Sequence, residues 1–491
     1  METALWWVRA DARLHDNTAL VAAAEADELL PVFVVDPRQY GERAYGGQRS
    51  FAFQKTGAYR ARFRRETIAD LRESLDDEGS GLLVREGRPG EVVPEVAAAV
   101  DADVVHFQAL PAPEEREAAR AVVSALGDAG VRTESHWTST LHHVADLPEG
   151  VQGIDDTFTP FRQSVESDSR VREPLPEPEL PPTPDLGRLD GGHGAFPTLD
   201  DLGLERPEYD DRGVLAFEGG ETAGLDRLEA YVWEGDHLRA YKRTRNGLLG
   251  ADYSSKLSPW LAAGCLSPRY VKREVDRYEA ERVANDSTYW LLFELRWRDF
   301  MAFQTAKHGG QFFARNGIRE REDIDWADPG SDPAAREQFE RWKRGETGIP
   351  FVDANVRELN ATGFMSNRGR QNVASVLANS LRIDWRRGAA YFETQLVDYD
   401  PCSNYGNWAY VAGVGNDSRD SAFDVVEQAK RYDEDGEYVR HWLPELRGLP
   451  PGYVHEPWKM DPEEQAAYGV VLGEDYPEPM VDLEASDEPF R

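Results

Sequence analysis

The first 150 residues alternate short apolar runs with amphipathic segments. The mostly apolar runs, which we expect to form strands, are 4–8, 30–35, 81–84 and 102–107. Between them lie segments rich in Ala, Glu and Arg, at 18–28, 58–77 and 113–129. Continuous apolar strands that alternate with helices are typical of a parallel sheet covered on both faces. We therefore predict an α/β domain over residues 1–170, with a parallel five-stranded, Rossmann-like sheet.

The pattern changes after residue 170. The segment EPLPEPELPPTP (173–184) has six prolines in twelve residues, and acidic, Gly-rich stretches follow to about residue 220. Because such composition resists packing, we interpret 171–220 as a long exposed linker between domains. Beyond it, apolar residues recur at helical spacing, as in 289–303 and 370–382, and strand-like alternation is scarce. This predicts a larger all-α domain over 221–480 and a disordered acidic tail at 481–491.

Composition narrows the class of protein. The 491 residues carry a formal net charge of −34, and 48 of the 56 basic residues are arginine. A charged surface of this kind is typical of a protein that stays soluble in very high salt; the alternative is a moderately acidic protein from a GC-rich genome. With two cysteines, a disulfide framework or a Cys-based metal cluster is excluded. No run is apolar enough to span a membrane and the N-terminus lacks the layout of a signal peptide, so we expect a soluble cytoplasmic protein.

The basic residues are not evenly spread. Residues 236–274 carry a net charge of +5 and residues 364–391 a net charge of +4, so the rest of the chain carries −43. Such an acidic chain should repel nucleic acid unless its basic residues cluster. The two basic segments indicate an anion-binding surface, or else local pairing with acidic neighbours.

Four polar clusters in the helical half could carry chemistry. In the first, Ser254, Ser255, Lys256 and Ser258 precede Pro259 at an expected helix start. Hydroxyls, free backbone N–H groups and the positive end of the helix dipole suit a phosphate, although ordinary N-capping would also explain them.

The second cluster, ELRWRDF (294–300), places Glu294, Trp297 and Arg298 at i, i+3 and i+4 on one helix face. A carboxylate, an aromatic plate and a guanidinium suit a flat heteroaromatic ligand, while an exposed ion pair beside a core Trp is the common alternative.

The third and fourth clusters are NRGRQ (367–371) and DYDPCSNYGNW (398–408). In the fourth, Asp398 and Asp400 could bind a base amino group or a ribose hydroxyl, and Asn404 presents an amide. No His or further carboxylate follows to complete a metal shell, so we expect no metal. Neither G-x-G-x-x-G after the first strand nor G-x-x-x-x-G-K-[ST] occurs, and a phosphate-binding loop in the α/β half is unsupported.

At the fourth cluster the chain resembles a known family. LVDYDPCSNYGNWAYVAGVGNDSR (396–419) is similar to the flavin-domain signature of the photolyase/cryptochrome family, and most of all to its DASH-type cryptochromes. The likeness extends through the segments 9–17, 158–166, 241–269, 293–300 and 347–371, in the order and spacing of the family.

The resemblance implies a U-shaped FAD in the helical domain. By similarity, Tyr241 and the segment Ser254, Ser255, Lys256, Leu257 and Ser258 contact its pyrophosphate. Arg298 faces the ribityl or phosphate side, Asp398, Tyr399 and Asp400 lie along the cofactor, and Asn404 lies beside flavin N5. Trp408, Trp385 and Trp326 match the family's electron relay, with Trp408 innermost; Trp342 and a local insertion blur the match at Trp326.

The resemblance also implies a pocket for damaged DNA. By similarity, Glu294 hydrogen-bonds a thymine of a cyclobutane dimer and Trp297 packs against it. Asn367 and Tyr410 face the substrate, and Arg370 with neighbouring basic residues holds phosphates. The implied activity is blue-light-driven repair of cyclobutane pyrimidine dimers by electron transfer from excited reduced FAD, in a monomeric protein. A photosensory protein that signals through the flavin redox state is the alternative, and a nucleotide-binding protein without photochemistry a third.

Two departures from relatives refine this prediction. Photolyases acting on duplex DNA commonly carry Trp where Tyr410 stands and Met where Gln371 stands. Both differences are DASH-like and favour single-stranded DNA, because a single strand spares the cost of base flipping. Many relatives hold a folate antenna through a Glu where Ala109 stands here. This argues against a methenyl-folate antenna and leaves a different chromophore or an empty site open.

Overall fold

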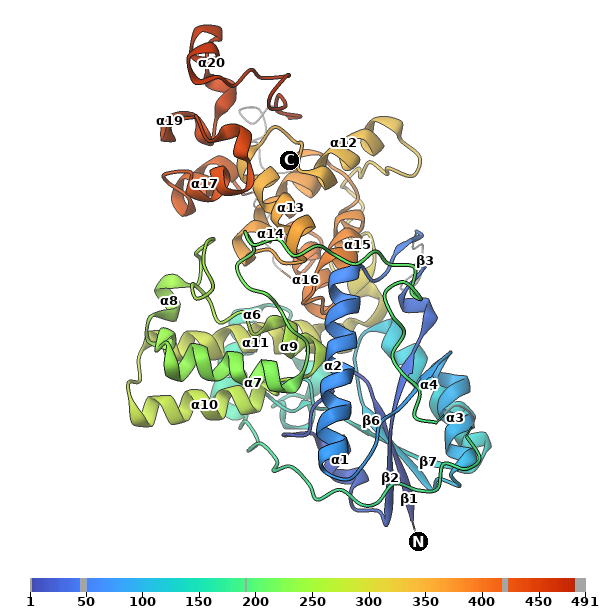
Figure 1. Ribbon diagram of the computed structural model, residues 1–491. Coiled ribbons are helices and arrows are strands. Elements are labelled where there is room, and N and C mark those ends of the chain that lie inside the picture. Colours follow the sequence, from blue (N-terminus) through green and yellow to red (C-terminus); the bar gives the residue numbers. More distant parts are fainter. Residues whose placement is uncertain (1, 45–50, 190–191, 417–422, 482–491) are drawn as a thin grey trace.

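A computed structural model describes residues 2–44, 51–189, 192–416 and 423–481 (Figure 1). The predicted acidic tail lies outside the described residues, apart from Val481. A parallel five-stranded sheet in the order β5-β2-β1-β6-β7 forms the centre of the α/β half, as predicted. Its strands are β1 (Thr3–Val8), β2 (Glu28–Val35), β5 (Leu83–Glu86), β6 (Val104–Gln108) and β7 (Arg132–His136). A short antiparallel ribbon pairs β3 (Glu42–Arg43) with β4 (Phe53–Gln54).

Helices cover both faces of the sheet because its central strands are apolar on both sides. They are α1 (Thr18–Ala23), α2 (Ala58–Asp77), α3 (Pro89–Ala99) and α4 (Pro113–Asp128), followed by α5 (Gly150–Gly153) and α6 (Phe158–Asp168). One core joins Trp6 and Val8 of β1 to α1 and α2, and the other joins Leu5 and Trp7 to α3 and α4. The long α2 also runs up against the helical half (Figure 1).

The segment between α6 and α7 contains no helix or strand in its described residues. It is partly exposed but runs along the α/β half, where the backbone N–H groups of Asp16, Leu29 and Val84 donate to carbonyls of Leu175, Pro182 and His193. Leu199 and its neighbours also pack into the core under α2. The segment is therefore anchored along its length.

The helical half is all-α, as predicted, and surrounds a large core that contains Trp342, Trp385 and Trp408. Its helices are α7 (Glu221–Glu229), α8 (Tyr241–Thr244), α9 (Ser258–Ala263), α10 (Pro268–Glu281), α11 (Asp286–His308), α12 (Pro333–Arg344), α13 (Pro350–Thr362), α14 (Asn367–Ser375), α15 (Trp385–Gln395), α16 (Pro401–Val411), α17 (Val425–Tyr432), α18 (Glu437–Trp442), α19 (Pro451–Val454) and α20 (Pro462–Tyr468). Within the described residues, no helix is both long and apolar enough to cross a membrane.

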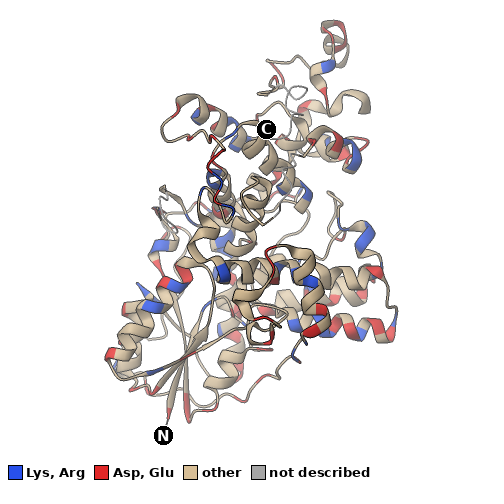
Figure 2. Cartoon of the chain, turned by 180° about the vertical axis from the view of Figure 1, so that it is seen from behind, with Lys and Arg blue, Asp and Glu red and all other residues tan. Residues whose placement is uncertain are grey.

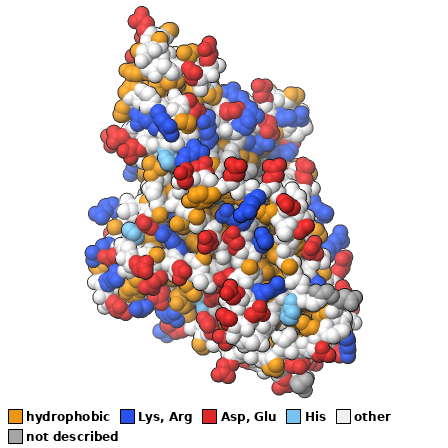
Figure 3. All heavy atoms as spheres, in the orientation of Figure 1, with side chains coloured by type: hydrophobic (Ala, Val, Ile, Leu, Met, Phe, Trp, Pro, Cys, Tyr) orange, Lys and Arg blue, Asp and Glu red, His pale blue; other side chains and the backbone are white. Residues whose placement is uncertain are grey.

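Acidic side chains are spread over the surface, with basic ones between them. Figure 2 shows both signs along the helices, and Figure 3 shows the same mixture on the face seen in Figure 1. Many basic side chains therefore have acidic partners, such as Lys242 with Asp286 and Arg277 with Glu281.

Candidate functional site

The loop between α8 and α9 forms one wall of a cavity in the helical half. Arg227 of α7 supports this loop, since its Nε donates to the Ser255 carbonyl (2.9 Å) and its Nη1 to Asp252 Oδ1 (2.9 Å). Lys256 adopts a left-handed backbone (φ 54°), and its buried Nζ donates to the Ala251 carbonyl (2.8 Å). Burial lowers the pKa of Lys256 to about 7. The helix after the loop begins at Ser258, as the sequence predicts.

The second wall is the face of α11 that carries Glu294, Trp297 and Arg298. Oε1 of Glu294 accepts a hydrogen bond from Arg245 Nη1 (2.6 Å). Burial raises the pKa of the Glu294 carboxyl, and Arg245 acts in the opposite direction. The Trp297 ring stacks on Phe158 at 3.7 Å between centroids, with 10° between the planes. The cavity wall therefore has a fixed aromatic plate beside a carboxyl group whose protonated form is favoured by burial.

Asp398 joins two elements at the base of the cavity. Its Oδ2 accepts from Ser258 Oγ (2.6 Å), and Arg370 Nη2 donates to both carboxylate oxygens (2.9 and 2.8 Å). Arg370, which we expected at a DNA phosphate, thus bridges α14 to the segment before α16. Asp400 caps α16, since its Oδ1 accepts from the Ser403 N–H (2.6 Å).

These walls enclose a cavity of about 450 Å³. The predicted site residues that line it are Tyr241, Ser254, Ser255, Lys256, Leu257, Ser258, Glu294, Trp297, Arg298, Asn367, Arg370, Gln371, Asp398, Asp400 and Tyr410. The structure thus brings together the residues expected around FAD and those expected around a DNA lesion.

Two predicted cofactor residues do not line this cavity. Tyr399 lies against the Arg60 guanidinium, 4.4 Å from the ring centroid, and lines a smaller cavity of about 160 Å³ next to the sheet. Asn404 is buried in the first turn of α16, where its Nδ2 donates to the Ala389 carbonyl (2.9 Å).

The larger cavity fits a dinucleotide cofactor. Its hydroxyl donors, such as Ser254, suit a pyrophosphate, while the carboxylates suit ribose hydroxyl or base amino groups. Arg298 lines the cavity, but its Nη1 and Nη2 donate to the carbonyls of Ser139 and Leu261. The Tyr253 side chain also lines the cavity, while its hydroxyl is buried away from it.

The cavity opens past the start of α14. Asn367 is exposed there, and Arg368 donates to Gln371 Oε1 (2.9 Å) and to Asn246 Oδ1 (3.0 Å). Tyr410 of α16 is half-buried on the same cavity. This rim is polar and basic, in contrast to most of the surface.

The three predicted relay tryptophans are all buried close to α15 and α16. The Trp408 ring packs against Gly388 of α15, where an added Cβ would lie 2.2 Å from the ring. Trp385 Nε1 donates to the Arg315 carbonyl (3.0 Å), and Arg315 Nη2 donates to the Trp326 carbonyl (2.7 Å). The centroid of the Trp342 ring lies 6.2 Å from that of the Trp408 ring, so Trp342 is a direct neighbour of Trp408.

Sequence reasoning gave no role to three residues that support the site: Arg245, Arg227 and Phe158. Arg245 holds Glu294, Arg227 fixes the loop before α9, and Phe158 backs Trp297. Arg245 and Phe158 stand in the segments 241–269 and 158–166 that resemble the family, so a signal was present, but spacing alone does not reveal contacts between elements far apart in the chain.

Comparisons with known proteins agree with this geometry. A family model described as the FAD binding domain of DNA photolyase matches residues 290–491, and one described as DNA photolyase matches residues 4–180. A cryptochrome DASH of Natronomonas pharaonis is 59% identical over 486 residues, which cover 99% of each chain. A cryptochrome structure from Synechocystis sp. is 45% identical, covers 99% of this chain and 98% of its own, and has a TM-score of 0.92.

A more distant structure is informative about the cofactor. An archaeal photolyase of Sulfolobus tokodaii, solved with two FAD molecules, is 26% identical, covers 99% of this chain and 97% of its own, and has a TM-score of 0.77. The predicted cofactor, FAD, is thus supported both by the matched domain and by a structural neighbour. The chain belongs to the photolyase/cryptochrome family and, within it, to the DASH cryptochromes.

Proposed function

We propose that this protein is a blue-light-driven photolyase that repairs cyclobutane pyrimidine dimers and prefers single-stranded DNA. The observation that carries the proposal is the shared cavity, which joins Glu294, Trp297 and Asn367 to the loop and carboxylates suited to FAD. A sensor that reports only the flavin redox state would not need a lesion pocket against its cofactor. Bound FAD would supply light-driven electron transfer.

Glu294 and Trp297 would recognise the damaged base. Burial raises the pKa of Glu294, and in its protonated form the carboxyl can donate a hydrogen bond to a pyrimidine carbonyl as negative charge develops on it. Arg245 would keep Oε1 in place at 2.6 Å while the other oxygen faces the substrate. Trp297, fixed on Phe158, would offer a flat surface for the extruded base.

The rim would hold a single strand more readily than a duplex. Asn367, Gln371 and Tyr410 line the opening with polar groups, and Arg368 provides positive charge for the backbone. Extrusion from a duplex costs a few kcal/mol, which a single strand avoids. A chain of net charge −34 has little long-range attraction to offset that cost.

Repair can be measured with thymine-dimer oligonucleotides, single-stranded and duplex, given to the FAD-loaded protein in molar KCl with a reductant. We expect loss of dimers only in blue light and only in single strands. Repair of both substrates would contradict the strand preference. Failure to repair either one, in a protein whose flavin is still photoreduced, would contradict the photolyase proposal and favour the sensor.

A matched pair of variants isolates the lesion pocket. Glu294→Ala should lower the repair yield about 10²–10³-fold, because it removes the carboxyl donor aimed at the developing charge. Flavin content and photoreduction should stay unchanged. Glu337→Ala, on the exposed face of α12, makes the same chemical change away from the cavity and should repair normally.

A further inference from the structure

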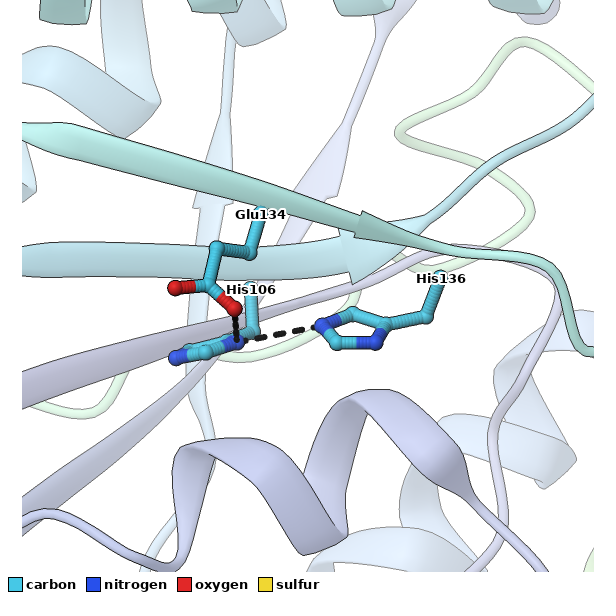
Figure 4. Close-up of side chains that lie close together, drawn as sticks. All are labelled: His106, Glu134 and His136. Carbon is cyan, nitrogen blue, oxygen red and sulfur yellow. Dashed lines mark hydrogen bonds and ion pairs between the residues drawn. The ribbon is translucent and has the colours of Figure 1, made fainter.

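Three potential metal ligands meet at the β7 edge of the sheet, away from the cavities described above. They are His106 of β6 with Glu134 and His136 of β7 (Figure 4). The parallel register pairs His106 with Glu134, and His136 follows two residues later. Because side chains alternate between the faces of a strand, all three lie on the same face of the sheet. That face is the one covered by α1, while Val105 and Phe107 point into the core under α3 and α4.

The spacing of the ligand atoms fits a single ion. His106 Nδ1 lies 3.1 Å from His136 Nε2 and 3.9 Å from Glu134 Oε2. Two nitrogens bound to one tetrahedral zinc at the usual bond length are separated by about 3.3 Å. A small adjustment of the rings would therefore bring both nitrogens within bonding distance of one ion, with the carboxylate as third ligand.

The chemical state of the ligands is also suitable. His106 is buried and His136 is half-buried, and an unprotonated imidazole nitrogen presents the lone pair that a metal ion needs. Glu134 is half-exposed and supplies a negative charge. Glu2 and Glu25 add further negative charge near His106, and Arg132 adds a positive charge.

Neither of the two cavities is lined by these residues, and the proposed function gives the His106–His136 contact no role. We propose that His106, Glu134 and His136 form a binding site for one borderline divalent metal ion of the zinc class. Two imidazoles and one carboxylate form a three-ligand set in which the fourth position is left to water. The ion would tie β7, the polar edge strand, to β6.

The alternative is a plain hydrogen bond between two neutral imidazoles. Titration calorimetry with Zn²⁺ on the FAD-loaded full chain, in a chelator-free potassium nitrate buffer, separates the two. We expect saturable binding of one Zn²⁺ per chain. No saturable binding at this stoichiometry would overturn the proposal.

Variants assign the binding to these three side chains. His136→Ala should weaken Zn²⁺ binding at least about tenfold, because substitution of residues that only hydrogen-bond a metal ligand already lowers metal affinity by that factor. Glu134→Gln should weaken Zn²⁺ binding as well, and an unchanged affinity in either variant would overturn the three-ligand site.

The control is His308→Ala, because His308 Nε2 lies 2.8 Å from Asp156 Oδ1 in an imidazole–carboxylate pair outside the cluster. It should bind Zn²⁺ like the wild type. Flavin absorption checks that each variant is folded, and His136 and Glu134 are exposed enough for substitution to be tolerated.

Discussion

Two aspartates show how burial determines the contribution of a single ion pair to stability. Asp16 and Asp101 both have a left-handed backbone (φ 47° and 52°) and both pair with an arginine. Asp16 is fully buried, and its carboxylate accepts from Arg269 of α10 (2.5 and 3.0 Å) and from the Leu175 N–H (2.9 Å). The Asp101 side chain is 74% exposed and pairs with Arg188, also exposed.

The substitution Asp16→Ala should therefore lower the free energy of unfolding by about 3–5 kcal/mol, because Arg269 is left as an uncompensated buried charge. Asp101→Ala makes the same change at the same backbone conformation and should cost less than about 1 kcal/mol for its ion pair. Urea unfolding in molar KCl, followed by circular dichroism, measures both. Similar losses in the two variants would show that backbone conformation, rather than the buried ion pair, dominates.

At the residue scale, the sequence predicts which residues share a face better than it predicts which partners each of them contacts. The motif spacing correctly placed Glu294, Trp297 and Arg298 on one face of α11, because helical periodicity fixes which residues share a face. It could not predict that Arg370 is bound by Asp398, or that Tyr399 points to a different cavity. Both contacts depend on how α14 packs against α16 and the segment before it, and a local sequence pattern does not predict this packing.

The contact between α13 and α18 contains a buried acid with a raised pKa. Glu358 is fully buried, its Oε2 accepts from Tyr438 Oη (2.6 Å), and burial raises its pKa to about 8 from an ordinary 4.5. Between these two values the folded protein binds a proton that the unfolded chain releases. The stability of the wild type should then fall as the pH rises from 4.5 through 8.

Glu358→Gln removes this titration and keeps the shape and an acceptor for Tyr438. The free energy of unfolding of the wild type, relative to Glu358→Gln, should fall by up to about 1.4 kcal/mol per pH unit in this window. Urea unfolding at several pH values between 5 and 8 checks the slope. A difference that stays constant with pH would mean that Glu358 is ionised in the folded protein.

The pair α15 and α16 carries the proposed electron relay. Replacing Trp408 with Phe keeps the packing against Gly388 but removes the oxidisable indole, so light-driven reduction of bound FAD should slow at least tenfold. The absorbance of the oxidised flavin, followed during blue-light illumination in the presence of an external reductant, measures this rate. Trp442→Phe, in α18, is buried to the same degree and should leave the rate unchanged.

The third member of the relay is open to the same measurement. Trp326 is the third member predicted from the resemblance, whereas the Trp342 ring centroid lies 6.2 Å from that of Trp408. If Trp326→Phe slows photoreduction and Trp342→Phe does not, the sequence match holds. The reverse result would place Trp342 in the relay.

At the scale of elements, the apolar strands were easier to predict than the polar edge strand, and the helix α3 (Pro89–Ala99) was not predicted. The four apolar strands and the helices at 58–77 and 113–129 were predicted within a few residues. The fifth strand, β7, was not located because its residues, RTESH, are polar and lie at the exposed edge of the sheet. Pairing of β7 with β6 places Glu134 and His136 next to His106. The strand that was not predicted therefore supplies two of the three ligands of the proposed metal site.

For the whole molecule, the excess of acidic residues should make stability depend on salt. Salt has two opposite effects on this surface: it screens repulsion among acids and it weakens ion pairs such as Lys242–Asp286. Because the chain has 34 more acidic than basic residues, repulsion should outweigh attraction. The Debye length grows from about 3 Å at 1 M to 10 Å at 0.1 M salt, so repulsion then reaches across neighbouring side chains.

We therefore expect the thermal midpoint of the FAD-saturated protein to fall as KCl is lowered from 2 M to 0.1 M. For a chain of 491 residues, a loss of about 3–5 kcal/mol corresponds to a fall of about 3–5 °C. Sucrose at 0.1 M KCl is the control, because it strengthens apolar burial without screening charge, and it should restore little of the loss. Full restoration by sucrose would show that salt acts through apolar burial. An unchanged or higher midpoint at low salt would show that the paired charges dominate, and would favour the GC-rich interpretation of the composition over adaptation to high salt.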